Sequence, residues 1–205
     1  MDAAAALARN DRYIREFVEA LRICPYAKTC RESGKLQRRV LESLQQAPSV
    51  MAEIEAMPED SVEVALLIFP GAPAGSERAA RDFENFCAGL RPGLEAFYCV
   101  AFHPDLPRDL ADGHRAVQFI RRSPDPTIQM VRASVLRAVR GPDDGGTRVL
   151  TGAHELSLEQ LLAIATPLSL ADRIAQANLE TLQREGPDRI EALLSSFRAR
   201  AAGTS

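Results

Sequence analysis

Two short apolar runs, at residues 62–69 and 97–102, constrain the fold of this sequence most strongly. Both are rich in β-branched or large apolar side chains, so each predicts a buried β-strand. Residues 36–41 are a weaker candidate for a third strand. Because helical patterns separate and follow these runs, we expect an α+β fold in which helices cover a small mixed β-sheet, with a helical C-terminal segment.

Apolar residues recur at helical spacing in several other segments. They predict an amphipathic helix over residues 4–22 and a helix capped by Ser76. A further helix is predicted over residues 126–140, with Asp125 as its N-cap. Near the C-terminus, the Gly186-Pro187-Asp188 segment predicts the start of the last helix.

The sequence also indicates how the chain is divided. Residues 104–126 are polar and rich in proline, which predicts a long loop, and loops of that length in compact domains are usually functional or disordered. We expect an α/β core domain over residues 1–145 that carries the site. A helical extension over residues 146–205 is expected to pack on this core.

Composition excludes several classes of protein. With 46% apolar residues, 26% charged residues and a net charge of -3, the chain is typical of soluble globular proteins and lacks the basic charge of nucleic-acid binders. No signal peptide or membrane span is predicted, so we expect a cytoplasmic protein that acts on a small-molecule substrate. The four cysteines are expected to be free thiols, and without a CxxC pair they do not predict a zinc or iron–sulfur site.

His103 is the first candidate site residue. It ends the predicted strand at residues 97–102, and Pro104 turns the chain out of the sheet directly after it. A neutral imidazole on such a rigid support suits a haem-iron ligand. A general base, or a histidine whose nitrogens are satisfied in the core, are the alternatives.

Arg121 and Arg122 precede the predicted helix at residues 126–140. Guanidinium groups beside a helix N-terminus predict an anion site for a carboxylate or phosphate. In the alternative interpretation, one arginine is solvated and the other ties down the loop.

Cys24, followed by Pro25, lies where the first predicted helix ends. A thiolate there can bind haem iron or act as a nucleophile, and a half-buried structural cysteine is the alternative. His114 lies in the predicted loop and is interpreted either as a ligand contact or as a solvated residue. His154 is interpreted as a surface residue.

Four ordered motifs resemble a bacterial family of unknown function, DUF1415. They are Cys24-Pro25-Tyr26-Ala27, the LLIFP strand, Phe102-His103-Pro104, and Arg122-Ser123-Pro124-x-Pro126. The resemblance extends over residues 10–140. This chain departs from the pattern at Gln129 and Ala133, near the positions where the family usually has a histidine and a glutamate in its last helix.

The order of the motifs is also similar to that of the YqcI/YcgG family, which includes haem-dependent oxygenases with a histidine as iron ligand. This resemblance implies a haem-dependent oxidoreductase of the oxygenase type that oxidises a small nitrogen-containing metabolite, such as an amino acid. The resemblance implies His103 as the iron ligand, Arg121 and Arg122 near the haem propionates or the substrate carboxylate, and Cys24 and Tyr26 near the pocket. We therefore take Arg121 and Arg122 as candidate cofactor-binding residues, and Cys24 and Tyr26, together with His114 of the predicted loop, as candidate catalytic residues.

Two other functions stay open at this point. One is a non-catalytic protein that binds haem or an anionic metabolite, and the other is a cofactor-free enzyme with Cys24 as nucleophile. The oligomeric state is also open, with a homodimer as one option.

Overall fold

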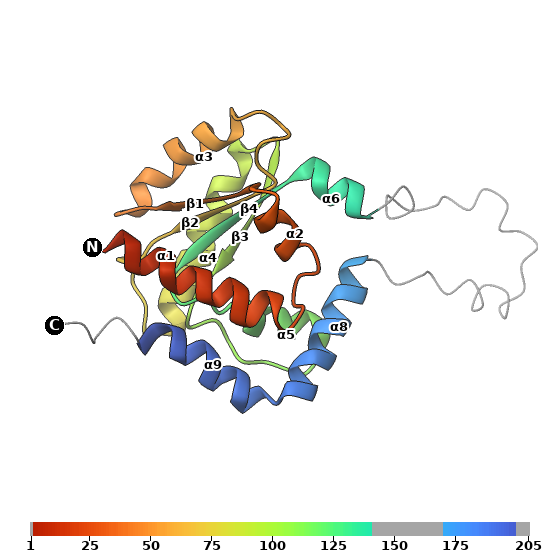
Figure 1. Ribbon diagram of the computed structural model, residues 1–205. Coiled ribbons are helices and arrows are strands. Elements are labelled where there is room, and N and C mark those ends of the chain that lie inside the picture. Colours follow the sequence, from red (N-terminus) through yellow and green to blue (C-terminus); the bar gives the residue numbers. More distant parts are fainter. Residues whose placement is uncertain (1, 141–169, 200–205) are drawn as a thin grey trace, which may run out of the picture.

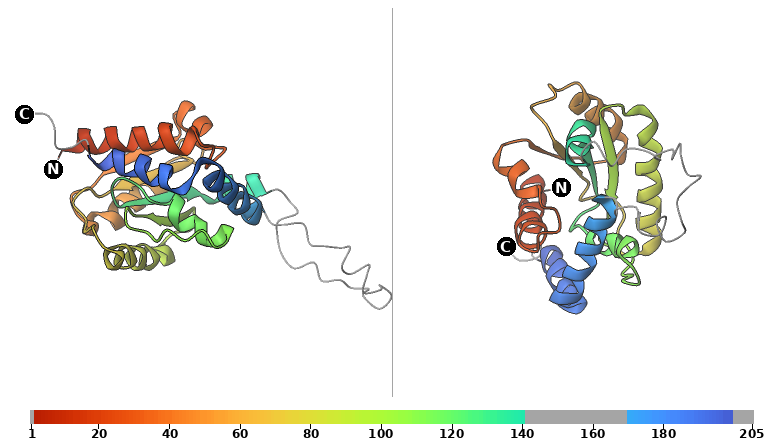
Figure 2. Two further views of the ribbon diagram at one scale, coloured as in Figure 1. Left: turned by 90° about the horizontal axis from the view of Figure 1, so that it is seen from below. Right: turned by 90° about the vertical axis from the view of Figure 1, so that its right-hand side faces the viewer.

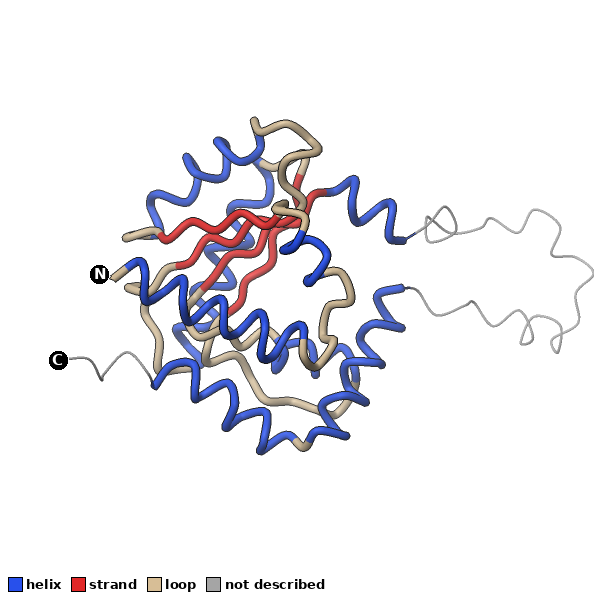
Figure 3. Tube along the Cα trace, viewed as in Figure 1, coloured by secondary structure: helices blue, strands red, loops and turns tan. Residues whose placement is uncertain are grey.

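The computed structural model describes residues 2–140 and 170–199, and a four-stranded sheet lies at its centre (Figure 1). The strands, red in Figure 3, lie in the order β1-β2-β4-β3, with β1 parallel to β2 and β4 antiparallel to both of its neighbours. Their bounds are β1 (Leu36–Val40), β2 (Val64–Ile68), β3 (Phe97–Phe102) and β4 (Thr127–Arg132).

Helices form a layer on each side of the sheet (Figure 2). They are α1 (Ala3–Arg12), the π-helix η1 (Tyr13–Glu19), α2 (Ala27–Glu32), α3 (Ala47–Glu55), α4 (Glu77–Leu90), α5 (Gly113–Ile120), α6 (Ala133–Arg140), α8 (Leu170–Glu185) and α9 (Pro187–Ala199), with 3-10 turns at Leu44–Gln46 and Arg91–Gly93. The predicted α+β class, with a mixed sheet and a helical C-terminal segment, is confirmed. Within the described ranges, no helix is both long enough and apolar enough to cross a membrane.

Two apolar clusters hold the layers together, one on each face of the sheet. On one face, Ile68 of β2 packs in a cluster with Phe119 of α5 and Phe197 of α9. On the other face, Leu67 packs in a cluster with Phe83 of α4. Neighbouring residues of β2 thus contribute to opposite clusters, as expected for a strand that is buried on both faces.

Several predicted elements are confirmed. The apolar runs at residues 62–69 and 97–102 contain β2 and β3, and residues 36–41 contain β1. Ser76 caps α4, because its side chain accepts a hydrogen bond from the N–H of Ala79 at 3.1 Å.

The helix predicted over residues 126–140 is wrong in its first half, where the chain forms β4 instead. Asp125 is not a helix cap. Its backbone oxygen accepts hydrogen bonds from the hydroxyls of Ser123 and Thr127. The segment Thr127–Arg132 is paired on both sides, with β2 and with β3, and these ladder bonds override a local apolar pattern that also fits a helix.

The loop predicted over residues 104–126 is also wrong in part, because it contains α5. Asp112 caps this helix by accepting from the N–H of Arg115 at 2.9 Å. A Cβ atom on Gly113 would lie 3.0 Å from the backbone of Ala175, so the glycine permits α5 and α8 to approach closely.

The helix predicted over residues 4–22 is observed as α1 and η1. After η1, Arg22 has a φ of 55°, in the left-handed region that non-glycine residues rarely adopt. The predicted domain boundary after residue 145, and His154, lie outside the described residues.

Candidate functional site

The strands β1, β2 and β3 end at one edge of the sheet, because β4 runs in the opposite direction. We call this the carboxyl edge. Three segments leave the sheet there: residues 41–46, 69–76 and 103–106. Ligands of open α/β sheets usually bind outside the carboxyl ends of the strands. The carboxyl edge is therefore the candidate functional site.

His103 follows β3 at this edge and is fully buried. Its Nε2 lies 3.0 Å from the carbonyl oxygen of Pro73, and the backbone N–H of Asp105 donates to its Nδ1 at 3.2 Å. Since a carbonyl only accepts and a backbone N–H only donates, these partners place the proton on Nε2 and leave Nδ1 bare. The ring is thus neutral, and burial lowers the pKa of His103 below its ordinary value.

An iron ligand needs a ring nitrogen whose lone pair is free, and His103 does not offer one. Both nitrogens are hydrogen-bonded, and the ring packs against Phe83 with 5.7 Å between the ring centroids. His103 as placed here does not fit the role of a haem ligand, and haem binding stays a prediction. Within residues 2–140 and 170–199, no three His, Cys, Asp or Glu side chains gather in a way that could hold a metal ion.

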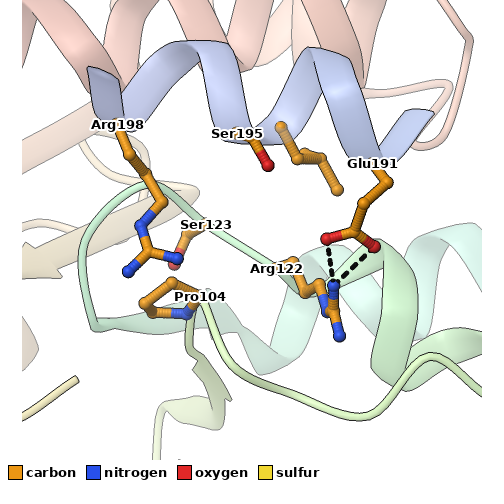
Figure 4. Close-up of a pocket in the computed structure, with 7 residues that line it drawn as sticks. Pro104, Arg122, Ser123, Glu191, Ser195 and Arg198 are labelled. Carbon is orange, nitrogen blue, oxygen red and sulfur yellow. Dashed lines mark hydrogen bonds and ion pairs between the residues drawn. The ribbon is translucent and has the colours of Figure 1, made fainter. Parts of the chain in front are cut away.

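Arg122 is held by contacts within the protein (Figure 4). Its Nε donates to the carbonyl of Leu106 at 2.5 Å, and its Nη1 lies 2.6 and 2.7 Å from the two carboxylate oxygens of Glu191 on α9. The pocket beside this ion pair measures only about 20 Å³, which suits a single water molecule. These contacts favour the interpretation in which one arginine ties down the loop.

Arg121 contributes its backbone to the same edge, because its carbonyl oxygen accepts from the N–H of His103 at 3.1 Å. Burial lowers the pKa of its guanidinium, and the negative charge of Glu84 on α4 opposes this effect. Its assignment as a cofactor-binding residue stays a prediction.

Cys24 and Tyr26 are exposed in the segment between η1 and α2. The backbone carbonyl of Cys30 in α2 accepts from the N–H of Lys35 at 3.1 Å, and the Lys35 carbonyl accepts from the N–H of Val64, the first residue of β2, at 3.3 Å. These contacts place α2 at the amino ends of β1 and β2, the opposite edge of the sheet from His103. The structure therefore separates the Cys24 segment from the carboxyl edge.

His114 lies in the first turn of α5, and 73% of its side-chain surface is exposed. Its Nε2 is 3.0 Å from a carboxylate oxygen of Asp172, so it links α5 to α8. This contact does not connect His114 with the Cys24 segment, and a catalytic role for His114 stays a prediction.

A cavity of about 220 Å³ lies at the carboxyl edge between the segments that follow β1 and β2. We call it the edge cavity. Phe69, which follows β2 and is 1% exposed, forms part of the cavity lining. Glu42, which follows β1, contributes a carboxylate to the lining. Further lining residues are Ser43, Leu44, Ala72 and Pro73. Among these, Pro73 is the residue that receives the hydrogen bond of His103.

Sequence reasoning did not identify the edge cavity. Its residues carry a weak signal, which is that both lining segments directly follow predicted strands, at residues 36–41 and 62–69. That signal needed one further fact, namely that β1 and β2 are parallel neighbours. Only then do the two strand ends lie at one edge and enclose a shared space.

Comparison with known proteins gives one match. A protein family described as "Protein of unknown function (DUF1415)" matches residues 5–146, more than half of the chain. The matched residues include all four strands and exclude α8 and α9. No curated protein and no solved structure matches.

Proposed function

The chain belongs to the DUF1415 family, and we propose that it is a binding protein for a small nitrogen-containing metabolite, held in the edge cavity. The observation that carries this proposal is the volume of about 220 Å³ at the carboxyl edge. Pockets for drug-sized ligands range upward from about 300 Å³, so a smaller metabolite suits the edge cavity.

The lining of the edge cavity favours a ligand with a protonated nitrogen and a short apolar chain. The Glu42 carboxylate can accept a charge-assisted hydrogen bond from an ammonium group, and the Ser43 hydroxyl offers a second polar contact. Leu44 and Ala72 supply the apolar surface that a methylene chain would cover. The lining contains no basic side chain, which disfavours the anionic ligand considered from sequence.

Binding is favoured over oxidative catalysis by the state of His103. Its only N–H is donated to Pro73, and its bare nitrogen receives the N–H of Asp105. A general base must reach the proton that it removes, and both ring nitrogens of His103 are already hydrogen-bonded to the backbone of the protein.

We expect Glu42→Gln to weaken the binding of n-butylammonium, used as the probe, by about tenfold, because a charge-assisted hydrogen bond becomes a neutral one. Titration calorimetry on the full chain measures this change. Glu53→Gln, at an exposed position of α3, is the matched control and should bind like the wild type. Equal affinity of the Glu42 and Glu53 variants would contradict the proposed role of Glu42.

A second candidate function, a cofactor-free enzyme with Cys24 as nucleophile, is favoured by a separate observation. The π-helix η1 ends at Glu19, five residues before Cys24, and the left-handed Arg22 lies two residues before it. Rare backbone conformations of this kind are frequent near functional sites. Cys24 is also the exposed thiol, whereas the other three cysteines are buried.

We expect iodoacetamide to alkylate Cys24 at least about tenfold faster than the other cysteines of the folded protein, because attack requires an accessible thiolate. Burial raises the pKa of Cys30 and of Cys87 to about 11, and that of Cys99 to about 12. Mass spectrometry of timed reactions measures the selectivity, and Cys24→Ser should abolish the fast phase. Alkylation of all four thiols at one rate would contradict it.

A further inference from the structure

The segment at residues 70–76, between β2 and α4, forms one wall of the edge cavity through Gly71, Ala72 and Pro73. We call it the wall loop. Its two prolines have no N–H to donate, and the N–H of Ala72 donates locally, to the carbonyl of Phe69 at 3.1 Å. Two hydrogen bonds join the wall loop to the segment that follows β3, and both run to residues of the His103-Pro104-Asp105 turn.

The first of these bonds comes from His103, which lies behind the wall. Its Nε2–H donates to the carbonyl of Pro73 at 3.0 Å, from a ring that is fully buried and in contact with Phe83. The ring itself is oriented by the N–H of Asp105, which donates to Nδ1 at 3.2 Å. The donor that holds Pro73 is therefore fixed in direction.

The second bond comes from the side chain of Asp105. Its Oδ2 accepts from the backbone N–H of Gly75 at 2.5 Å. Gly75 has a φ of 100°, a conformation that favours glycine, and it directs its N–H toward the carboxylate. The other oxygen of Asp105, Oδ1, lies 3.6 Å from a guanidinium nitrogen of Arg198 on α9.

We propose that His103 and Asp105 are a pair of positioning residues that hold the wall loop and thereby set the affinity of the edge cavity for its ligand. This inference rests on the proposed function. His103 holds the wall loop through its hydrogen bond to Pro73, and Asp105 holds it through its hydrogen bond from Gly75. A wall that already has its bound conformation raises affinity, because the loop then loses less conformational entropy when the ligand binds.

A matched pair of substitutions at His103 tests the inference, with n-butylammonium as the probe. In His103→Gln the side-chain amide nitrogen can reach the Pro73 carbonyl, as Nε2 does, whereas the shorter His103→Asn side chain can accept from Asp105 but cannot reach Pro73. We expect His103→Gln to bind within about threefold of the wild type and His103→Asn to bind about tenfold more weakly. A purely structural role of the ring would lower the stability of both variants without this split in affinity.

Asp105→Ala provides a second variant, because it removes the tether to Gly75 together with the ion pair between Asp105 and Arg198. We expect it to weaken binding about fivefold, with Asp109→Ala, an exposed carboxylate paired with Arg115, as the unaffected control. If the wild type binds the probe but His103→Asn and Asp105→Ala match it, the inference is overturned and the proposed function stands. If the wild type does not bind the probe, the proposed function itself fails.

Discussion

Replacing Phe197 with alanine is expected to lower the free energy of unfolding by about 3–5 kcal/mol. The Phe197 ring is fully buried in the cluster that α9 shares with the sheet, and it lies edge-on to Tyr13 of η1, with 6.2 Å between the centroids. Alanine would remove these contacts and leave a cavity between α9 and η1. The measurement is equilibrium unfolding in urea, monitored by circular dichroism.

The neighbouring residue Ser196 supplies the control for this prediction. It is exposed on α9, so Ser196→Ala should change the stability by less than about 0.5 kcal/mol. A loss of less than about 1 kcal/mol for Phe197→Ala would contradict the packing described here and would mean that α9 adds little to the core.

The second large effect is expected at Asp125, where an ion pair joins α1 to the segment before β4. Its two carboxylate oxygens receive Nε and Nη2 of Arg9 at 3.0 and 2.9 Å, and the two side chains are only 10% and 16% exposed. Asp125→Asn would leave the Arg9 guanidinium largely buried without its counter-charge. We expect the free energy of unfolding to fall by about 2–3 kcal/mol, measured by urea unfolding.

Two further variants separate this pair from ordinary surface charges. Asp82→Asn breaks the exposed pair with Arg78 on α4 and should cost less than about 0.5 kcal/mol. In a double-mutant cycle with Arg9→Met, we expect a coupling energy of at least about 1 kcal/mol between Arg9 and Asp125. A coupling energy near zero would show that the pair contributes no more than the control pair does.

The parts of the fold that could be predicted from the sequence are those that depend on local signals. The run at residues 97–102 is apolar throughout and Pro104 follows it closely, so this strand can be predicted without knowledge of the strands beside it. The same holds for α4, where Ser76 supplies the cap. By contrast, Thr127–Arg132 has a pattern that fits either a helix or a strand, and its position between β2 and β3 decides the outcome.

In the candidate site, too, the features set by local sequence could be predicted and those set by long-range contacts could not. The sequence placed His103 correctly at a strand end, but it could not show which groups its nitrogens would contact, because Pro73 lies 30 residues away in the chain. Glu42 and Phe69 meet at the edge cavity only because β1 and β2 are parallel neighbours. Such long-range pairings depend on strand order, which local periodicity does not encode.

The measurement that tests the edge cavity most directly is a titration of the isotope-labelled protein with n-butylammonium, followed through the backbone amide chemical shifts. Binding in the edge cavity predicts saturable shifts at Ser43, Leu44 and Ala72, which line it, and no shifts at Cys24, which precedes α2 at the opposite edge of the sheet. Shifts confined to the Cys24 segment, or none at all, would contradict ligand binding at the carboxyl edge.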